Sequence, residues 1–161
     1  MSMSLLGQSV TLTISHFDFP SGQRVQIGQF SYTVDGGIEF FGVGEYTGSS
    51  WTGSEYDIKY GEQFYFTADV SSDQIQVTYD GTGTSYAPTG LTFEFSSLSG
   101  VSSGTVVGVS EISADELGGV SAHDPMFTSD SVTISLVPTG AGVSGSQTVQ
   151  VTLQEQNIAP T

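Results

Sequence analysis

Residues 9–15 read Ser-Val-Thr-Leu-Thr-Ile-Ser, a strict alternation of small polar and branched apolar side chains. Successive side chains of a β-strand point to opposite faces, so this period of two predicts a strand with one buried and one solvated face. The alternation returns along the chain, at residues 25–27, 30–34, 38–43, 64–66, 75–79, 91–95, 107–109, 132–136 and 149–153. We therefore expect about nine or ten strands.

Turn residues separate most of these segments, and helix signals are scarce. Glycine, proline and aspartate mark the turns at residues 35–37, 80–81, 88–90, 118–119 and 138–140. Only Ile112 to Leu117, with a capping-box pattern at Ser113–Glu116, favours a short turn of helix. Half-buried strands at this spacing predict an all-β protein, an antiparallel two-sheet β-sandwich with a jelly-roll-like topology.

The alternation changes phase between Ile27 and Phe30, at Gly28-Gln29. In an uninterrupted strand, such a change would turn one set of apolar side chains toward solvent. The sequence therefore predicts either a β-bulge or a bend between two strands at this point.

The charge of the chain is one-sided. Its 161 residues include 17 acids and two bases, Arg24 and Lys59, for a formal net charge of −15. Such a body repels phosphate backbones and anionic lipid headgroups, so we expect no nucleic-acid partner. No apolar run approaches the roughly 18 residues that a membrane span needs, so we expect no membrane insertion.

The chain length and composition fit one domain. We expect a single β-sandwich domain over residues 1–153 and a flexible C-terminal tail over residues 154–161. Charged residues make up only 12% of the chain, against a typical value of about 25%, so serine, threonine, glycine and glutamine must build the surface. This composition is common in extracellular β-proteins, although Met1 to Leu6 lacks the features of a signal peptide.

One segment matches a catalytic motif literally. Gly100-Val-Ser102-Ser-Gly104 has the G-x-S-x-G pattern, which acts as a nucleophile only on a sharp turn from a strand into a helix. Here the segment joins two predicted strands in a chain rich in serine and glycine. We interpret the match as chance and expect no enzymatic activity.

Acidic residues gather in one stretch near the predicted loops of the second half. Asp115, Glu116, Asp124 and Asp130 lie within sixteen residues of one another. Calcium prefers carboxylate and carbonyl oxygens from such loops, so these four are the candidate ligands for calcium. The alternative is that they are ordinary solvated loop acids.

Two long predicted loops, residues 45–55 and 80–90, each carry aromatic side chains among small residues. Trp51, with Tyr46, Tyr56 and Tyr86, is a candidate platform for a sugar ring, because a pyranose face packs on an aromatic ring. The alternative is that Trp51 folds back and covers one end of the sandwich.

Several segments resemble a group of uncharacterised bacterial exported proteins, many of which carry a PEP-CTERM-type C-terminal sorting signal. The resembling stretches occur in the order usual for the group and are Leu5–Thr13, Asp35–Phe40, Val70–Tyr79, Gly90–Leu98 and Val107–Ser110. The resemblance implies an extracellular or cell-surface β-domain, and it supplies no catalytic residues.

These observations leave two functional hypotheses. The first is a non-enzymatic extracellular structural or adhesive module, a component of a surface, matrix, fibre or virion, whose partners are further copies of itself or other surface components. The second is a carbohydrate-binding module, a β-sandwich stabilised by calcium, with glycans as its ligands.

Overall fold

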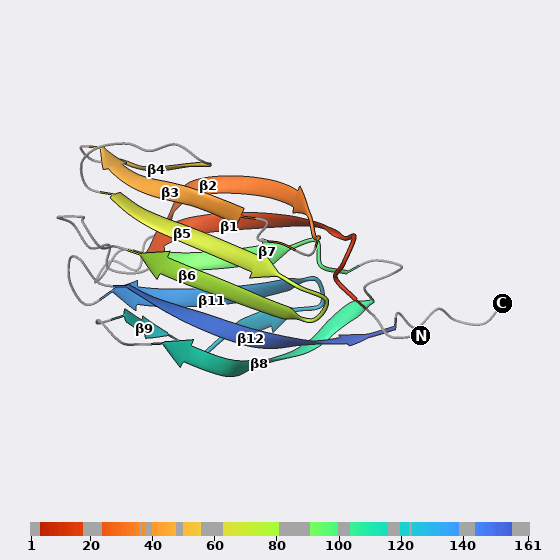
Figure 1. Cartoon of the computed structure of the whole chain (residues 1–161). Coiled ribbons are helices and arrows are strands. Elements are labelled where there is room, and N and C mark those ends of the chain that lie inside the picture. The colour runs from red at the N-terminus through yellow and green to blue at the C-terminus, as the bar shows by residue number, and fades with distance from the viewer. Residues whose placement is uncertain are drawn as a thin grey trace.

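The structure of the chain is a computed structural model. It describes residues 4–17, 24–35, 37, 40–47, 50–55, 63–80, 91–99, 104–115, 120–122, 124–138 and 144–155. Within these residues there are twelve strands and no helix, and hence no helix that is long and apolar enough to cross a membrane (Figure 1). The strands are β1 (Ser9–Phe17), β2 (Arg24–Thr33), β3 (Phe40–Thr47), β4 (Ser50–Glu55), β5 (Gln63–Val70), β6 (Gln74–Asp80), β7 (Leu91–Ser96), β8 (Thr105–Asp115), β9 (Val120–Ala122), β10 (Met126–Thr128), β11 (Ser131–Pro138) and β12 (Ser144–Gln154).

The strands form two six-stranded antiparallel sheets. The first has the order β10-β11-β7-β1-β2, with β9 also paired to β11, and the second has the order β4-β3-β5-β6-β12-β8. The prediction of an all-β, two-sheet antiparallel sandwich is therefore confirmed. The described residues form more strands than the nine or ten expected, because the alternation did not reveal β4 or the three-residue strands β9 and β10. The jelly-roll topology stays a prediction.

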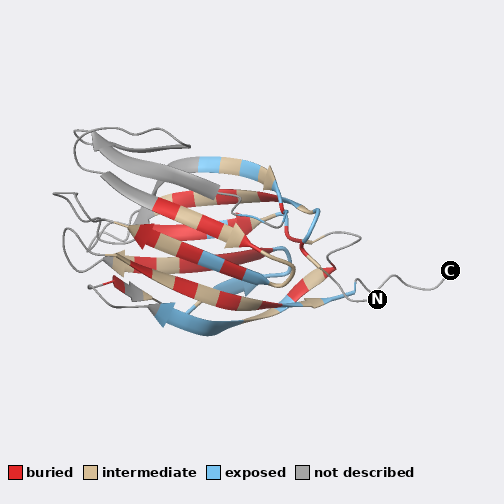
Figure 2. Ribbon diagram, viewed as in Figure 1, coloured by how far each residue is buried: buried red, intermediate tan, exposed pale blue. Residues whose placement is uncertain are grey.

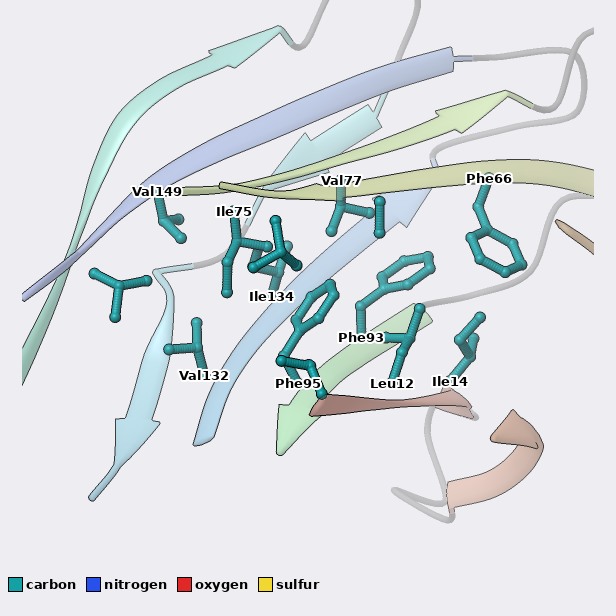
Figure 3. Close-up of a cluster of buried hydrophobic side chains, with 14 of the residues drawn as sticks. Leu12, Ile14, Phe66, Ile75, Val77, Phe93, Phe95, Val132, Ile134 and Val149 are labelled. Carbon is teal, nitrogen blue, oxygen red and sulfur yellow. The ribbon is translucent and has the colours of Figure 1, made fainter. Parts of the chain in front are cut away.

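The core lies between the two sheets and is made by the apolar phase of each strand. Phe93 of β7 in the first sheet meets Phe66 of β5 in the second, with ring centroids 5.8 Å apart (Figure 3). Figure 2 shows the alternation of buried and partly exposed positions along the strands. Further side chains with at most 2% exposure come from both sheets, among them Val10, Leu12, Ile14, Ala68, Val70, Ile75, Val77, Tyr79, Leu91, Phe95, Val132, Ile134, Leu136, Val149 and Val151.

On the outer face of β1 and β2, uncharged polar side chains pair across the two strands. Thr11 and Ser31, partners on β1 and β2, share a hydrogen bond between their hydroxyl oxygens, 2.8 Å apart. On the next outward pair, Nε2 of Gln29 donates to Oγ1 of Thr13 over 3.1 Å. These cross-strand bonds fit the low charge content predicted for the surface.

The predicted phase change in β2 is a β-bulge inside one continuous strand. Ile14 of β1 pairs with Gly28, and the next residue, Ser15, pairs with Gln26, so Ile27 is the extra residue. The bulge lies one residue before the Gly28-Gln29 position expected from sequence, and no break separates two strands.

Two sequence-based predictions of local structure were wrong. Ile112 to Asp115 is not helical, because this segment continues β8 and pairs with β12, and that cross-strand pairing overrides the local capping-box signal. Residues 45–55 are not a long loop, because β3 and β4 pair as a hairpin over most of that range. Glu116, Leu117 and residues 81–90 lie outside the described residues, as do residues 156–161 of the predicted tail.

We expect Phe93→Ala to lower the free energy of unfolding by about 3–5 kcal/mol, because it removes a fully buried ring and leaves a cavity between the sheets. Glu94→Ala, at the neighbouring outward position of β7, is the matched control and should change it by less than about 0.5 kcal/mol. Urea denaturation measures both. Equal losses for the two variants would contradict the assignment of the core.

Candidate interaction surface

The predicted aromatic residues are only partly described. Tyr46 lies on β3 and Trp51 on β4, and the backbone register of the hairpin pairs these two residues directly. Tyr56 and Tyr86 lie outside the described residues. The structure therefore brings together two of the four residues proposed for sugar binding.

Two of the four predicted calcium ligands, Asp115 and Asp130, lie far apart. Asp115 is the last residue of β8. Asp130 lies near the start of β8, because the carbonyl oxygen of the preceding residue, Ser129, accepts a hydrogen bond from the Val106 amide. The nine residue-to-residue steps of strand from Val106 to Asp115 span roughly 25–30 Å, far beyond the reach of one ion. Among the described residues, no three His, Cys, Asp or Glu side chains are close enough to hold a metal ion.

The other two predicted ligands are Glu116, outside the described residues, and Asp124, which is exposed just before β10. Sequence separation alone suggested a cluster because it does not reveal that β8 is fully extended. Ser102 of the G-x-S-x-G match also lies outside the described part of the chain.

The outermost strands of the two sheets share a feature that the sequence revealed only in part. Every shift in register among the described strand pairs falls on a strand at a sheet edge. The extra residues are Ile27 in β2 and both Val107 and Ile112 in β8. A bulge bends the strand and breaks the regular spacing of its backbone hydrogen-bonding groups, which hinders pairing with another strand.

An inward-facing carboxylate adds to the protection of β8. Glu111 pairs with Val149, which is fully buried, so Glu111 lies on the core-facing side of the edge strand. One of its carboxylate oxygens accepts a hydrogen bond of 3.0 Å from Nε2 of Gln147, whose side chain is 1% exposed. An inward charge on an edge strand disfavours a further strand beside it, because that strand would bury the carboxylate.

The bulged residues of β8 are also its exposed apolar residues. Among the described residues, five large hydrophobic side chains are exposed, and four of them lie on β8 and β10: Val107 at 45%, Ile112 at 50%, Met126 at 55% and Phe127 at 45%. The fifth is Leu6, before β1. We use the name β8–β10 side for the two adjoining edge strands that carry these four side chains. Met126 pairs with Thr133 and Phe127 with core-facing Val132, so Met126 and Phe127 point to opposite faces of the first sheet.

β8 and β10 are held beside each other although they belong to different sheets. The Val106 amide donates to the Ser129 carbonyl oxygen over 2.9 Å, and the two strands are in contact. Val106 directly precedes Val107 in β8, and Ser129 follows directly after β10. The β8–β10 side therefore spans both sheets where their edges meet, and β8 lies outside β12 in Figure 1.

The sequence contains a signal for this surface. Val106-Val107 and Met126-Phe127 are each two apolar residues in succession. Successive side chains of a strand point to opposite faces, so only one residue of each pair can point to the buried side of a regular strand. Each pair therefore requires either a bulge or an exposed apolar side chain.

Two titratable groups, Asp69 and Tyr79, have raised pKa values. Burial, and after it the nearby carboxylate of Asp35, raise the pKa of Asp69 above its usual value. Burial and the charge of Asp80 likewise raise the pKa of Tyr79. In both groups burial is the larger cause of the raised pKa, and the neighbouring carboxylate adds to it.

Comparison of the chain with protein-family models, with curated proteins and with solved structures finds no match.

We expect Glu111→Ala to lower the free energy of unfolding by about 1–3 kcal/mol, because it removes the oxygen that accepts the hydrogen bond from buried Gln147. Glu111→Gln keeps an oxygen acceptor at this position and should cost less than about 1 kcal/mol. Urea denaturation of both variants measures the difference. Equal stability of the two variants would show that the hydrogen bond contributes nothing.

Proposed function

We propose that the chain is a non-enzymatic extracellular module with a structural or adhesive role, and that it binds another surface or matrix component through the β8–β10 side. The observation that carries this proposal is the gathering of exposed apolar side chains on two adjacent edge strands. Exposed apolar groups on a monomer gain free energy when a partner removes them from water, and their concentration in one place marks an interaction site.

The protected edges support one mode of binding over another. Bulges in β2 and β8, and the three-residue length of β9 and β10, disfavour the addition of a strand from another chain at these edges. The partner is therefore recognised by side chains on the β8–β10 side. The same protection disfavours fibres in which copies of this chain pair strand to strand.

An extracellular location is part of the proposal. It is supported by the low content of charged residues and by the polar outer face of β1 and β2, where threonine, serine and glutamine side chains bond to one another.

The second candidate is a carbohydrate-binding module. The pairing of Tyr46 with Trp51 favours it, since two aromatic residues at opposed positions of a hairpin supply part of a sugar-binding platform. In this candidate calcium stabilises the sandwich, and the glycan lies at the β3–β4 hairpin rather than at the β8–β10 side.

One binding experiment separates the two candidates. The labelled domain is incubated with surface and matrix material from cells that produce it, beside a Met126→Ser/Phe127→Ser variant. We expect the double variant to bind at least about tenfold more weakly, because two exposed apolar groups lose their contact with the partner. Gln74→Ser/Gln76→Ser, at two exposed positions of β6, is the matched control and should bind as the wild type does.

Two further arms test the alternative. If Trp51→Ala or a calcium chelator abolishes binding while Met126→Ser/Phe127→Ser leaves it intact, the carbohydrate-binding module is correct and the β8–β10 side is not the site. If the wild-type domain binds none of this material, the adhesive role itself is wrong.

A further inference from the structure

We propose that the partner of the β8–β10 side is a positively charged, apolar protein segment, in which aliphatic or aromatic side chains alternate with lysine or arginine. This inference rests on the proposed function and adds the chemistry of the partner. Three features of the described residues carry it: the acids beside the apolar side chains, the irregular backbone of β8, and the charge of a second copy.

Exposed acids accompany the apolar side chains along the chain. Asp124 is exposed and lies two residues before Met126. Asp130 follows Ser129, the residue bonded to Val106, and so lies close to the start of β8 near Val107. A partner that covers the apolar groups therefore approaches carboxylates as well, and it gains most if it places cationic groups beside them.

Asp130 is held in a fixed position by its own turn. Its carboxylate oxygen Oδ1 accepts a hydrogen bond of 3.1 Å from the Thr128 hydroxyl, and its carbonyl oxygen accepts one of 2.8 Å from the Leu98 amide. The turn between β10 and β11 thus presents this carboxylate in one place. A cationic side chain pays less conformational entropy to meet a carboxylate that is already fixed.

The backbone of β8 sets how the partner binds. Two bulges within an eleven-residue strand, together with the inward Glu111, interrupt the row of outward hydrogen-bonding groups. A strand added beside β8 would lose its register at each bulge. The apolar and ionic side-chain contacts must therefore supply the affinity, and the conformation of the partner backbone is left open.

A second copy of this chain is a poor occupant. Each copy carries a net charge of −15 and only two basic residues, Arg24 and Lys59. A copy would bring acids toward acids over the whole approaching surface, and like charges placed together cost binding free energy. A cationic segment reverses the sign of this interaction and is also steered to the surface at low salt.

The test uses three short synthetic peptides with the same alternating leucine and valine residues, separated by lysine, glutamine or glutamate. Fluorescence anisotropy measures their binding to the full chain at low salt. We expect the lysine peptide to bind, the glutamine peptide to bind more weakly, and the glutamate peptide to bind at least about tenfold more weakly than the lysine peptide.

Protein variants distinguish this site from the general attraction of a cation to an acidic protein. Asp124→Asn/Asp130→Asn should weaken the lysine peptide by about two- to fivefold, and Met126→Ser/Phe127→Ser by at least about tenfold. The matched control is Asp35→Asn/Asp69→Asn, which removes the same charge from two acids outside β8 and β10, one just after β2 and one on β5. It should change binding by less than about twofold, because screening limits the effect of acids that do not touch the peptide.

The outcomes that overturn the inference are specific. Equal weakening by the two charge variants would mean that the peptide responds to overall charge alone. Binding of the glutamate peptide as strong as that of the lysine peptide would remove the charge argument. If no peptide binds while the surface material still binds through Met126 and Phe127, the chemistry assigned to the partner is wrong and the proposed function stands. A dimer that Met126→Ser/Phe127→Ser abolishes would make a second copy the occupant.

Discussion

The backbone hydrogen-bonding groups on the outermost strands are the constraint on which the rest of the structure depends. An open sandwich leaves a row of N–H and C=O groups at each sheet edge, and any exposed strand of another chain can pair with them. Many proteins place lysine on such edges, but this chain has one lysine in total. It relies instead on geometry, with bulges in β2 and β8 and with very short strands in β9 and β10.

The device that protects β8 also exposes its apolar side chains. An extra residue in an edge strand shifts the phase of the side chains around it, and Val107 and Ile112 are the extra residues. Both are about half exposed, whereas Val106, one position earlier, is buried. Protection against strand pairing and the surface proposed for partner binding thus come from the same two insertions.

The sequence predicted the elements whose pattern is local. Val10, Leu12 and Ile14 follow a clean period of two and are fully buried, and the phase change near Gly28 predicted the bulge in β2 to within one residue. The bulges of β8 escaped notice because Val107 and Val109 fit a regular alternation by themselves. Only pairing with β12 reveals which of Val106 and Val107 is the extra residue.

The candidate sites depended on distance in space, which the sequence does not contain. Asp115 and Asp130 are close in sequence, but an extended β8 and the return through β10 place them at opposite ends of that strand. Tyr46 and Trp51 came together because a hairpin is a local structure that forms from neighbouring residues. The β8–β10 side joins strands of two different sheets, so its assembly required the whole topology.

Sedimentation velocity tests the protection of the edges most directly. Between about 0.01 M and 0.5 M sodium chloride the Debye length falls from about 30 Å to about 4 Å, so charge repulsion between copies is progressively removed. We expect a single monomeric species at every salt concentration for the wild type, and salt-dependent association for a variant that lacks Val107 and Ile112 and so has a regular β8 edge. Wild-type oligomers that grow with salt would contradict the account, because they would show that charge, and not the geometry of the edges, keeps the copies apart.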